Sequence, residues 1–91
     1  MSVVIRFSPP SLTAEQYDNV VRRLDEEGVR PPDGLDYEVC FGKPGNLEVI
    51  LVWDSQEQLD AFAPRLMPIL AEVGVDPGEP EVFEVHNIDK R

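Results

Sequence analysis

The middle of the chain reads LDYEVCF GKPGN LEVILVW from Leu35 to Trp53. In residues 35–41 and 47–53, apolar side chains recur at every second position, which is the period of a β-strand. The five residues between these runs include two glycines and a proline, and so short a connection joins neighbouring antiparallel strands. We therefore expect a β-hairpin at the centre of the fold.

One helical pattern and one further strand flank this hairpin on each side. Before it, residues 3–7 alternate like a strand, and residues 13–27 carry apolar side chains at the spacing of one helix face. After it, residues 59–73 keep helical spacing and residues 82–85 alternate again. The order of the predicted elements is therefore β-α-β-β-α-β.

This order is that of the ferredoxin-like fold. The sequence therefore predicts an α+β fold in a single domain over residues 1–91, with a four-stranded antiparallel sheet and both helices on one face. Right-handed crossovers place the strands at 3–7 and 47–53 in the middle of the sheet.

The second helical pattern contains two prolines, Pro64 and Pro68. A proline inside a helix lacks the N–H for one backbone hydrogen bond and clashes with the preceding turn. We therefore expect either two short helices or one kinked helix over residues 59–73.

The charge of the chain restricts its partners. Eighteen acidic and eight basic residues give a formal net charge of −10. A nucleic acid or an anionic membrane surface requires a basic patch, and the longest basic run is Arg22–Arg23. Cys40 is the single cysteine, so no intrachain disulfide is possible, and the chain shows neither a secretory signal nor a membrane-spanning stretch. We expect a cytoplasmic protein.

The alternation of the strands assigns side chains to two faces of the sheet. The face predicted to pack on the helices carries Val3, Ile5, Phe7, Tyr37, Val39, Phe41, Leu47, Val49, Leu51, Phe83 and Val85. The second face carries Val4, Arg6, Asp36, Glu38, Cys40, Glu48, Ile50, Val52, Val82, Glu84 and His86. A solvated face does not need several β-branched apolar residues near its centre. We therefore expect the sheet of a second copy to cover this face.

Several short segments resemble parts of the dimeric α+β barrel superfamily. They are Pro32-x-Gly34-Leu35, Val52-Trp53-Asp54-Ser55, Gln58-x-x-x-Phe62 and Val85-His86-Asn87. The resemblance extends over most of the chain and implies two ferredoxin-like sheets packed face to face in a homodimer barrel. Relatives in this superfamily include antibiotic-biosynthesis-type monooxygenases, muconolactone-isomerase-like enzymes, haem-degrading enzymes and stress-responsive proteins, so the resemblance implies no single activity.

If two sheets form a barrel, the polar side chains of the second face border its interior. His86 is a candidate general acid or base because imidazole titrates near neutral pH. Arg6 is a candidate for holding a substrate oxyanion, and Glu38 is the alternative base. The structural alternative is that Arg6 pairs with Glu38 or Glu84 and that His86 lies at a frayed strand end.

The remaining candidates are ligand contacts rather than catalytic groups. They are Cys40, Ile50, Val52 and Glu84. Cys40 has acidic or apolar neighbours in the sequence, which favours an inert buried thiol over a nucleophile. With one His and one Cys in the chain, no spacing typical of metal ligands occurs, and we expect neither a metal nor a cofactor.

These observations leave several functions open. The first is a homodimeric barrel protein of unassigned activity that binds an apolar or aromatic small molecule between sheet and helices. The second is a cofactor-independent monooxygenase or isomerase that uses His86 and Arg6. The third is a non-catalytic stress or accessory protein whose cavity is packed shut, and the fourth is a protein-binding module that uses a sheet edge.

Overall fold

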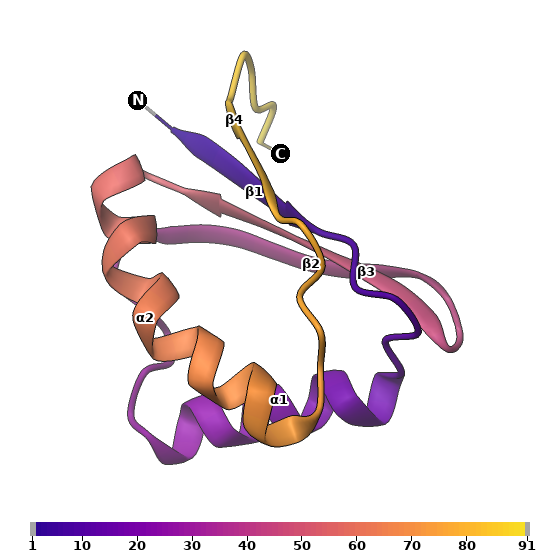
Figure 1. Ribbon diagram of the computed structural model, residues 1–91. Coiled ribbons are helices and arrows are strands. Elements are labelled where there is room, and N and C mark those ends of the chain that lie inside the picture. The colour runs from indigo at the N-terminus through magenta and orange to yellow at the C-terminus, as the bar shows by residue number, and fades with distance from the viewer. Residues whose placement is uncertain (1, 91) are drawn as a thin grey trace.

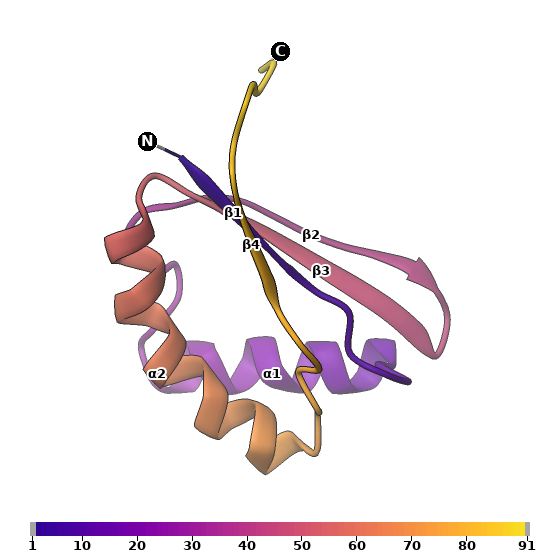
Figure 2. The same cartoon turned by 45° about the horizontal axis from the view of Figure 1, so that its top comes forward.

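The computed structural model describes residues 2–90 and confirms the predicted order of elements. The elements are β1 (Val3–Phe7), α1 (Ala14–Glu26), β2 (Leu35–Lys43), β3 (Asn46–Trp53), α2 (Gln56–Val73) and β4 (Glu81–Glu84). The strands form one antiparallel sheet in the order β2-β3-β1-β4, so β1 and β3 are central as predicted. Both helices lie on the same side of the sheet, and no helix covers the other side (Figures 1 and 2). The chain has a ferredoxin-like α+β fold.

Side-chain caps fix where both helices begin. The Thr13 hydroxyl accepts a hydrogen bond from the backbone N–H of Gln16, and the side-chain Oε1 of Gln16 accepts one from the backbone N–H of Thr13. This reciprocal pair satisfies two N–H groups that have no partner inside the helix. The Ser55 hydroxyl accepts from the N–H of Gln58 in the same way, so α2 begins at Gln56, three residues before the apolar pattern over residues 59–73.

α2 is one continuous helix, so the alternative of two short helices is wrong. Pro64 and Pro68 both lie inside it. Each proline removes one backbone hydrogen bond, and the helix bends along its length (Figures 1 and 2). The apolar residues on its inner face hold it against the sheet although these bonds are missing.

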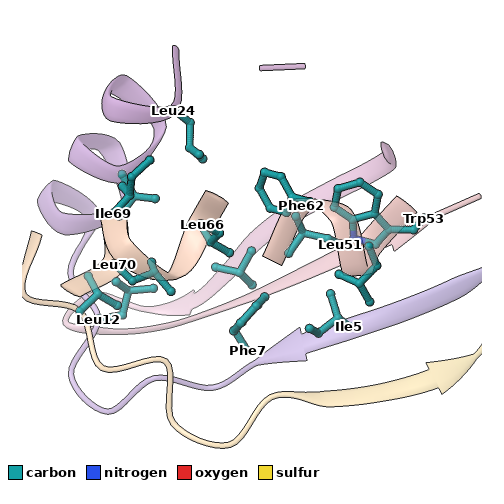
Figure 3. Packing of buried hydrophobic residues seen from close by; sticks show 14 of the residues in the cluster. Ile5, Phe7, Leu12, Leu24, Leu51, Trp53, Phe62, Leu66, Ile69 and Leu70 are labelled. Carbon is teal, nitrogen blue, oxygen red and sulfur yellow. The ribbon is translucent and has the colours of Figure 1, made fainter. Parts of the chain in front are cut away.

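The hydrophobic core fills the space between the helices and the two central strands (Figure 3). Trp53, at the end of β3, is completely buried. Its ring packs on that of Phe62 from α2, with 5.1 Å between the ring centroids. Trp53 thus connects the end of β3 to α2 through an aromatic contact.

The register of β2 differs from the predicted alternation. Leu35 lies opposite Trp53, but Tyr37 lies opposite Val52, and the shift between them marks an irregularity at this point of the strand. Beyond it, Glu38 and Cys40 share a face with the core residues of β3, and Tyr37, Val39 and Phe41 lie on the side without helices. The prediction that these three residues pack on the helices is therefore wrong.

The faces of β4 are also reversed relative to the prediction. Phe83 lies opposite Val4, and Val82 lies opposite Ile5. Residues directly opposite each other in an antiparallel pair lie on the same face. Phe83 therefore belongs to the uncovered side, and Val82 and Glu84 belong to the helix side.

We call the uncovered side of the sheet the outer face. It carries Val4, Arg6, Tyr37, Val39, Phe41, Glu48, Ile50, Val52, Glu81 and Phe83. Four of its apolar side chains, those of Tyr37, Val39, Phe41 and Phe83, are 39% to 50% exposed. The outer face is thus more apolar than the sequence predicts. Within residues 2–90, neither helix has the length and apolar character that crossing a membrane requires.

Candidate functional site

An apolar cavity of about 60 Å³ lies between the sheet and the two helices. Val20 and Leu24 of α1, Leu51 of β3, and Phe62 and Leu70 of α2 form part of its wall. An apolar lining with few polar groups is typical of a small-molecule site, but the volume is far below the roughly 300–1,000 Å³ of most ligand pockets.

One hydrogen-bonded polar pair borders this cavity. Tyr17 of α1 donates its hydroxyl hydrogen to the Oε2 atom of Glu38 on β2, and both residues line the cavity. Burial raises the pKa of Tyr17, and the adjacent Glu38 carboxylate raises it further. Tyr17 therefore stays protonated and keeps donating to Glu38 over the ordinary pH range.

Cys40 lies on the same side of β2 as Glu38 and packs against the core. Burial raises the pKa of its thiol, and the nearby carboxylates of Glu38 and Asp18 add to this effect. A thiol with a raised pKa is a poor nucleophile. Cys40 is therefore suited to packing rather than to catalysis.

Arg6 lies on the outer face, away from the cavity, where it bridges two carboxylates. Its Nε atom lies 3.8 Å from Oε1 of Glu48, and its Nη2 atom lies 3.4 Å from Oε1 of Glu81. The structural alternative for Arg6, an ion pair with Glu38 or Glu84, names the wrong partners, because the registers of β2 and β4 place those two residues on the helix side.

His86 and Glu84 do not join the other candidates. Glu84 ends β4 opposite Val3, and both Glu84 and His86 are exposed. Arg6 lies opposite Glu81, and five extended residues from Glu81 to His86 span about 16 Å. The structure therefore brings together Glu38 and Cys40 on one face and Arg6, Ile50 and Val52 on the other, with His86 beyond the last strand.

Tyr17 lines the cavity but is not among the predicted site residues. Its position on the apolar stripe of α1 places it inward, but the sequence does not show that β2 presents a carboxylate to it. The structural feature that brings Glu38 to Tyr17 is the irregularity of β2 between Leu35 and Tyr37. A strand without it turns Glu38 to the outer face.

The described part of the chain, residues 2–90, contains no cluster of three or more side chains suited to hold a metal ion. The cavity also does not fit a haem. Its volume of about 60 Å³ is below that of a cavity that binds benzene, about 150 Å³. Trp53 and His86, the one Trp and the one His of the chain, are not part of its wall.

No protein-family model matches the chain, and no curated protein matches it. Solved structures do match over nearly its whole length. SnoaB, a cofactor-independent oxygenase from Streptomyces nogalater, is 19% identical with a TM-score of 0.62, over 96% of this chain and 93% of that one. The heme-degrader MhuD from Mycobacterium tuberculosis, with two hemes bound in its active site, is 17% identical with a TM-score of 0.55, over 99% and 100% of the two chains. The chain shares their fold.

This similarity confirms, at the level of the fold, the resemblance predicted from the sequence. The de novo designed protein Foldit4 matches as well, with 18% identity and a TM-score of 0.56 over 91% of this chain and 94% of that one. An oxygenase, a heme-degrader and a designed protein therefore have one fold in common. The activity has to be argued from the site and not from the fold.

Replacing Tyr17 by Phe tests the polar pair. We expect Tyr17→Phe to lower the free energy of unfolding at pH 7 by about 1–2 kcal/mol, because the variant loses a hydrogen bond to a charged group that is partly shielded from water. Because the folded state raises the pKa of Tyr17, the unfolded chain loses this proton first. Wild-type stability therefore falls as the pH rises above about 10, and the variant lacks this part of the fall.

Urea unfolding at pH 7 and at pH 10.5 measures both effects. Tyr37→Phe is the matched control, since Tyr37 is 39% exposed on the outer face. Equal stability of wild type and Tyr17→Phe at both pH values would contradict the structural role of the pair.

Proposed function

We propose that the protein is a homodimeric barrel protein that binds a small apolar or aromatic molecule between the sheet and the helices. The observation that carries this proposal is an apolar cavity bordered by the Tyr17–Glu38 pair. The apolar wall favours an apolar ligand body, and the pair offers a carboxylate oxygen to orient it. A volume of about 60 Å³ holds only a few atoms, so binding of an aromatic ring requires the wall to move.

The outer face supports the homodimer. Monomeric proteins seldom expose a large contiguous apolar patch, and the outer face gathers apolar side chains from all four strands. A second copy offers the same apolar surface and covers it in a symmetric contact. Arg6 neutralises part of the charge of Glu48 and Glu81 within each face, which lowers the repulsion between two copies.

An enzymatic role as a cofactor-independent monooxygenase or isomerase is the more specific form of this proposal. Arg6 and His86 lie away from the cavity, so a reaction inside it depends on other groups. Glu38, predicted as the alternative base, borders the cavity and accepts a hydrogen bond from the Tyr17 hydroxyl. Within the proposed site, Glu38 is therefore the group best placed to take a proton from a ligand.

Two observations favour the second candidate, a non-catalytic stress or accessory protein with a closed cavity. The cavity is small. Arg6 already forms ion pairs with two carboxylates of the chain instead of binding a ligand. In this case the Tyr17–Glu38 pair connects α1 to the sheet and serves stability alone.

Native mass spectrometry of the protein as purified from cells separates these candidates. We expect a dimer that carries the mass of a retained small molecule. Val21→Phe is the control, because Val21 lines the cavity and a larger side chain there fills it without touching the outer face. This variant is expected to remain a dimer and to lose the extra mass. A dimer without extra mass supports the closed-cavity candidate, and a monomer overturns the proposed assembly.

A further inference from the structure

Phe62 lies where three separate spaces meet. It lines the apolar cavity of about 60 Å³, an inner void of about 10 Å³ beside Trp53, and a surface hollow of about 290 Å³. One wall of the hollow is formed by the connection between α1 and β2, including Val29, Pro31 and Pro32, and the other by α2. The ring of Phe62 therefore separates the hollow, which is open to solvent, from the space beneath the sheet.

The helix that carries Phe62 lacks backbone hydrogen bonds in this region. Pro64 and Pro68 lie inside α2, so neither the carbonyl of Asp60 nor that of Pro64 receives an N–H four residues later. Bends in helices occur at such positions. A change in the bend of α2 moves Phe62 without breaking the bonds that an ordinary helix has there.

Arg65 supplies the one cation on the wall of the hollow. In residues 2–90, the side chains of Arg6, Arg22, Arg23 and Lys90 form ion pairs, whereas those of Arg30, Lys43 and Arg65 form none. Of these three, Arg65 is the one that lines the hollow. Asp33 lines the same hollow and disfavours a second negative charge. The wall is partly apolar and carries one cation that forms no ion pair, one carboxylate and the Gln58 amide. This combination matches an amphipathic ligand with a single negative charge.

We propose that Phe62 gates an entry route from this hollow into the cavity, and that the route admits apolar or aromatic monocarboxylates. Arg65 holds the carboxylate at the surface, and the apolar body passes Phe62 into the space beneath the sheet. This inference rests on the proposed ligand-binding function and specifies its ligand class. When the Phe62 ring swings aside, the hollow, the cavity and the inner void join into one chamber of ligand size.

The head-group preference is tested with 3-cyclohexylpropanoate and its neutral amide, 3-cyclohexylpropanamide, titrated into the full chain and followed by NMR. We expect the carboxylate to bind about fivefold more tightly than the amide, the scale of one ion pair near the surface. Arg65→Gln is expected to abolish this preference, and Asp33→Asn to increase it. Equal affinities in the wild type, or a preference that survives in Arg65→Gln, would overturn the assignment to Arg65.

The gate is tested through the indole N–H signal of Trp53, the only tryptophan in the chain, whose ring packs on Phe62. Saturation with 3-cyclohexylpropanoate is expected to shift this signal, and Phe62→Leu is expected to speed exchange of the probe. If binding of the probe depends on Arg65 but the Trp53 indole signal does not shift, the probe stays in the hollow. This result would overturn the proposed gate. A molecule retained equally by wild type and Arg65→Gln in native mass spectrometry sustains the proposed function and overturns this inference.

Discussion

The Val39→Asp variant is expected to be a monomer at concentrations at which the wild-type chain is a dimer. Val39 lies on the outer face opposite Ile50. In a symmetric contact one substitution places two carboxylates in the interface, and removing such a charge from water without a partner costs several kcal/mol. We expect the dimer dissociation constant to rise by about 100-fold or more. Sedimentation velocity over a range of concentrations measures this change.

Val82→Asp is a closely matched control for this experiment. Val39 is 44% exposed and Val82 is 43% exposed, and both lie on edge strands. Val82, however, lies opposite Ile5 on the helix side, so its replacement leaves the outer face intact. Equal dissociation of both variants would show that added charge alone weakens the dimer. A monomeric wild type would refute the interface itself.

The second large effect is expected from Trp53→Ala. Trp53 is completely buried and packs on Phe62, and truncating a buried aromatic side chain to Ala costs about 3–5 kcal/mol. A small domain is stable by about 5–15 kcal/mol, so this variant is expected to be partly unfolded at 37 °C. Urea unfolding followed by circular dichroism measures the loss.

Trp53→Phe identifies the origin of this loss. The Nε1 atom of Trp53 is buried and has no hydrogen-bond partner within residues 2–90. Phe keeps a ring against Phe62 and removes this unsatisfied N–H, whose burial disfavours the folded state. We expect Trp53→Phe to cost clearly less than Trp53→Ala. Equal losses would mean that the size of the indole, rather than the aromatic contact, determines the stability.

The order of the elements could be predicted from the sequence because local patterns encode it. The Thr13 cap, the short turn between Lys43 and Asn46 and the spacing of the core residues on α1 each act within a few residues of the chain. The central position of β1 and β3 then follows from the handedness of the crossovers. The core contact between Trp53 and Phe62 follows from the same spacing.

The faces of the two edge strands could not be predicted in the same way. In β2 the irregularity between Leu35 and Tyr37 places every later side chain on the opposite face of the sheet. The alternation of apolar and polar residues in the sequence does not indicate this irregularity. In β4, Val82 and Phe83 are both apolar and adjacent, so either residue fits the core. The structure resolves both cases through pairing with central strands that are far away in the sequence.

Because these faces could not be predicted, the sequence identifies only part of the candidate site. Glu38 and Cys40 were expected on the face that forms the barrel interior, and they lie on the helix side instead. This placement makes Glu38 the partner of Tyr17 at the cavity. The catalytic roles of Arg6 and His86 stay predictions, and their separation in space argues against a shared role at one ligand.

The central position of β1 also has a consequence for synthesis on the ribosome. β1 is made first among the strands, but its partners are β3 and β4, which follow roughly 50 and 80 residues later in the chain. The β2–β3 hairpin closes a short loop and forms early, whereas β1 has to wait for distant partners. A nascent chain therefore exposes β1 with both edges free until β3 has been made, and with one edge free until residue 84 has been made. This interval is when chaperone binding protects the chain most.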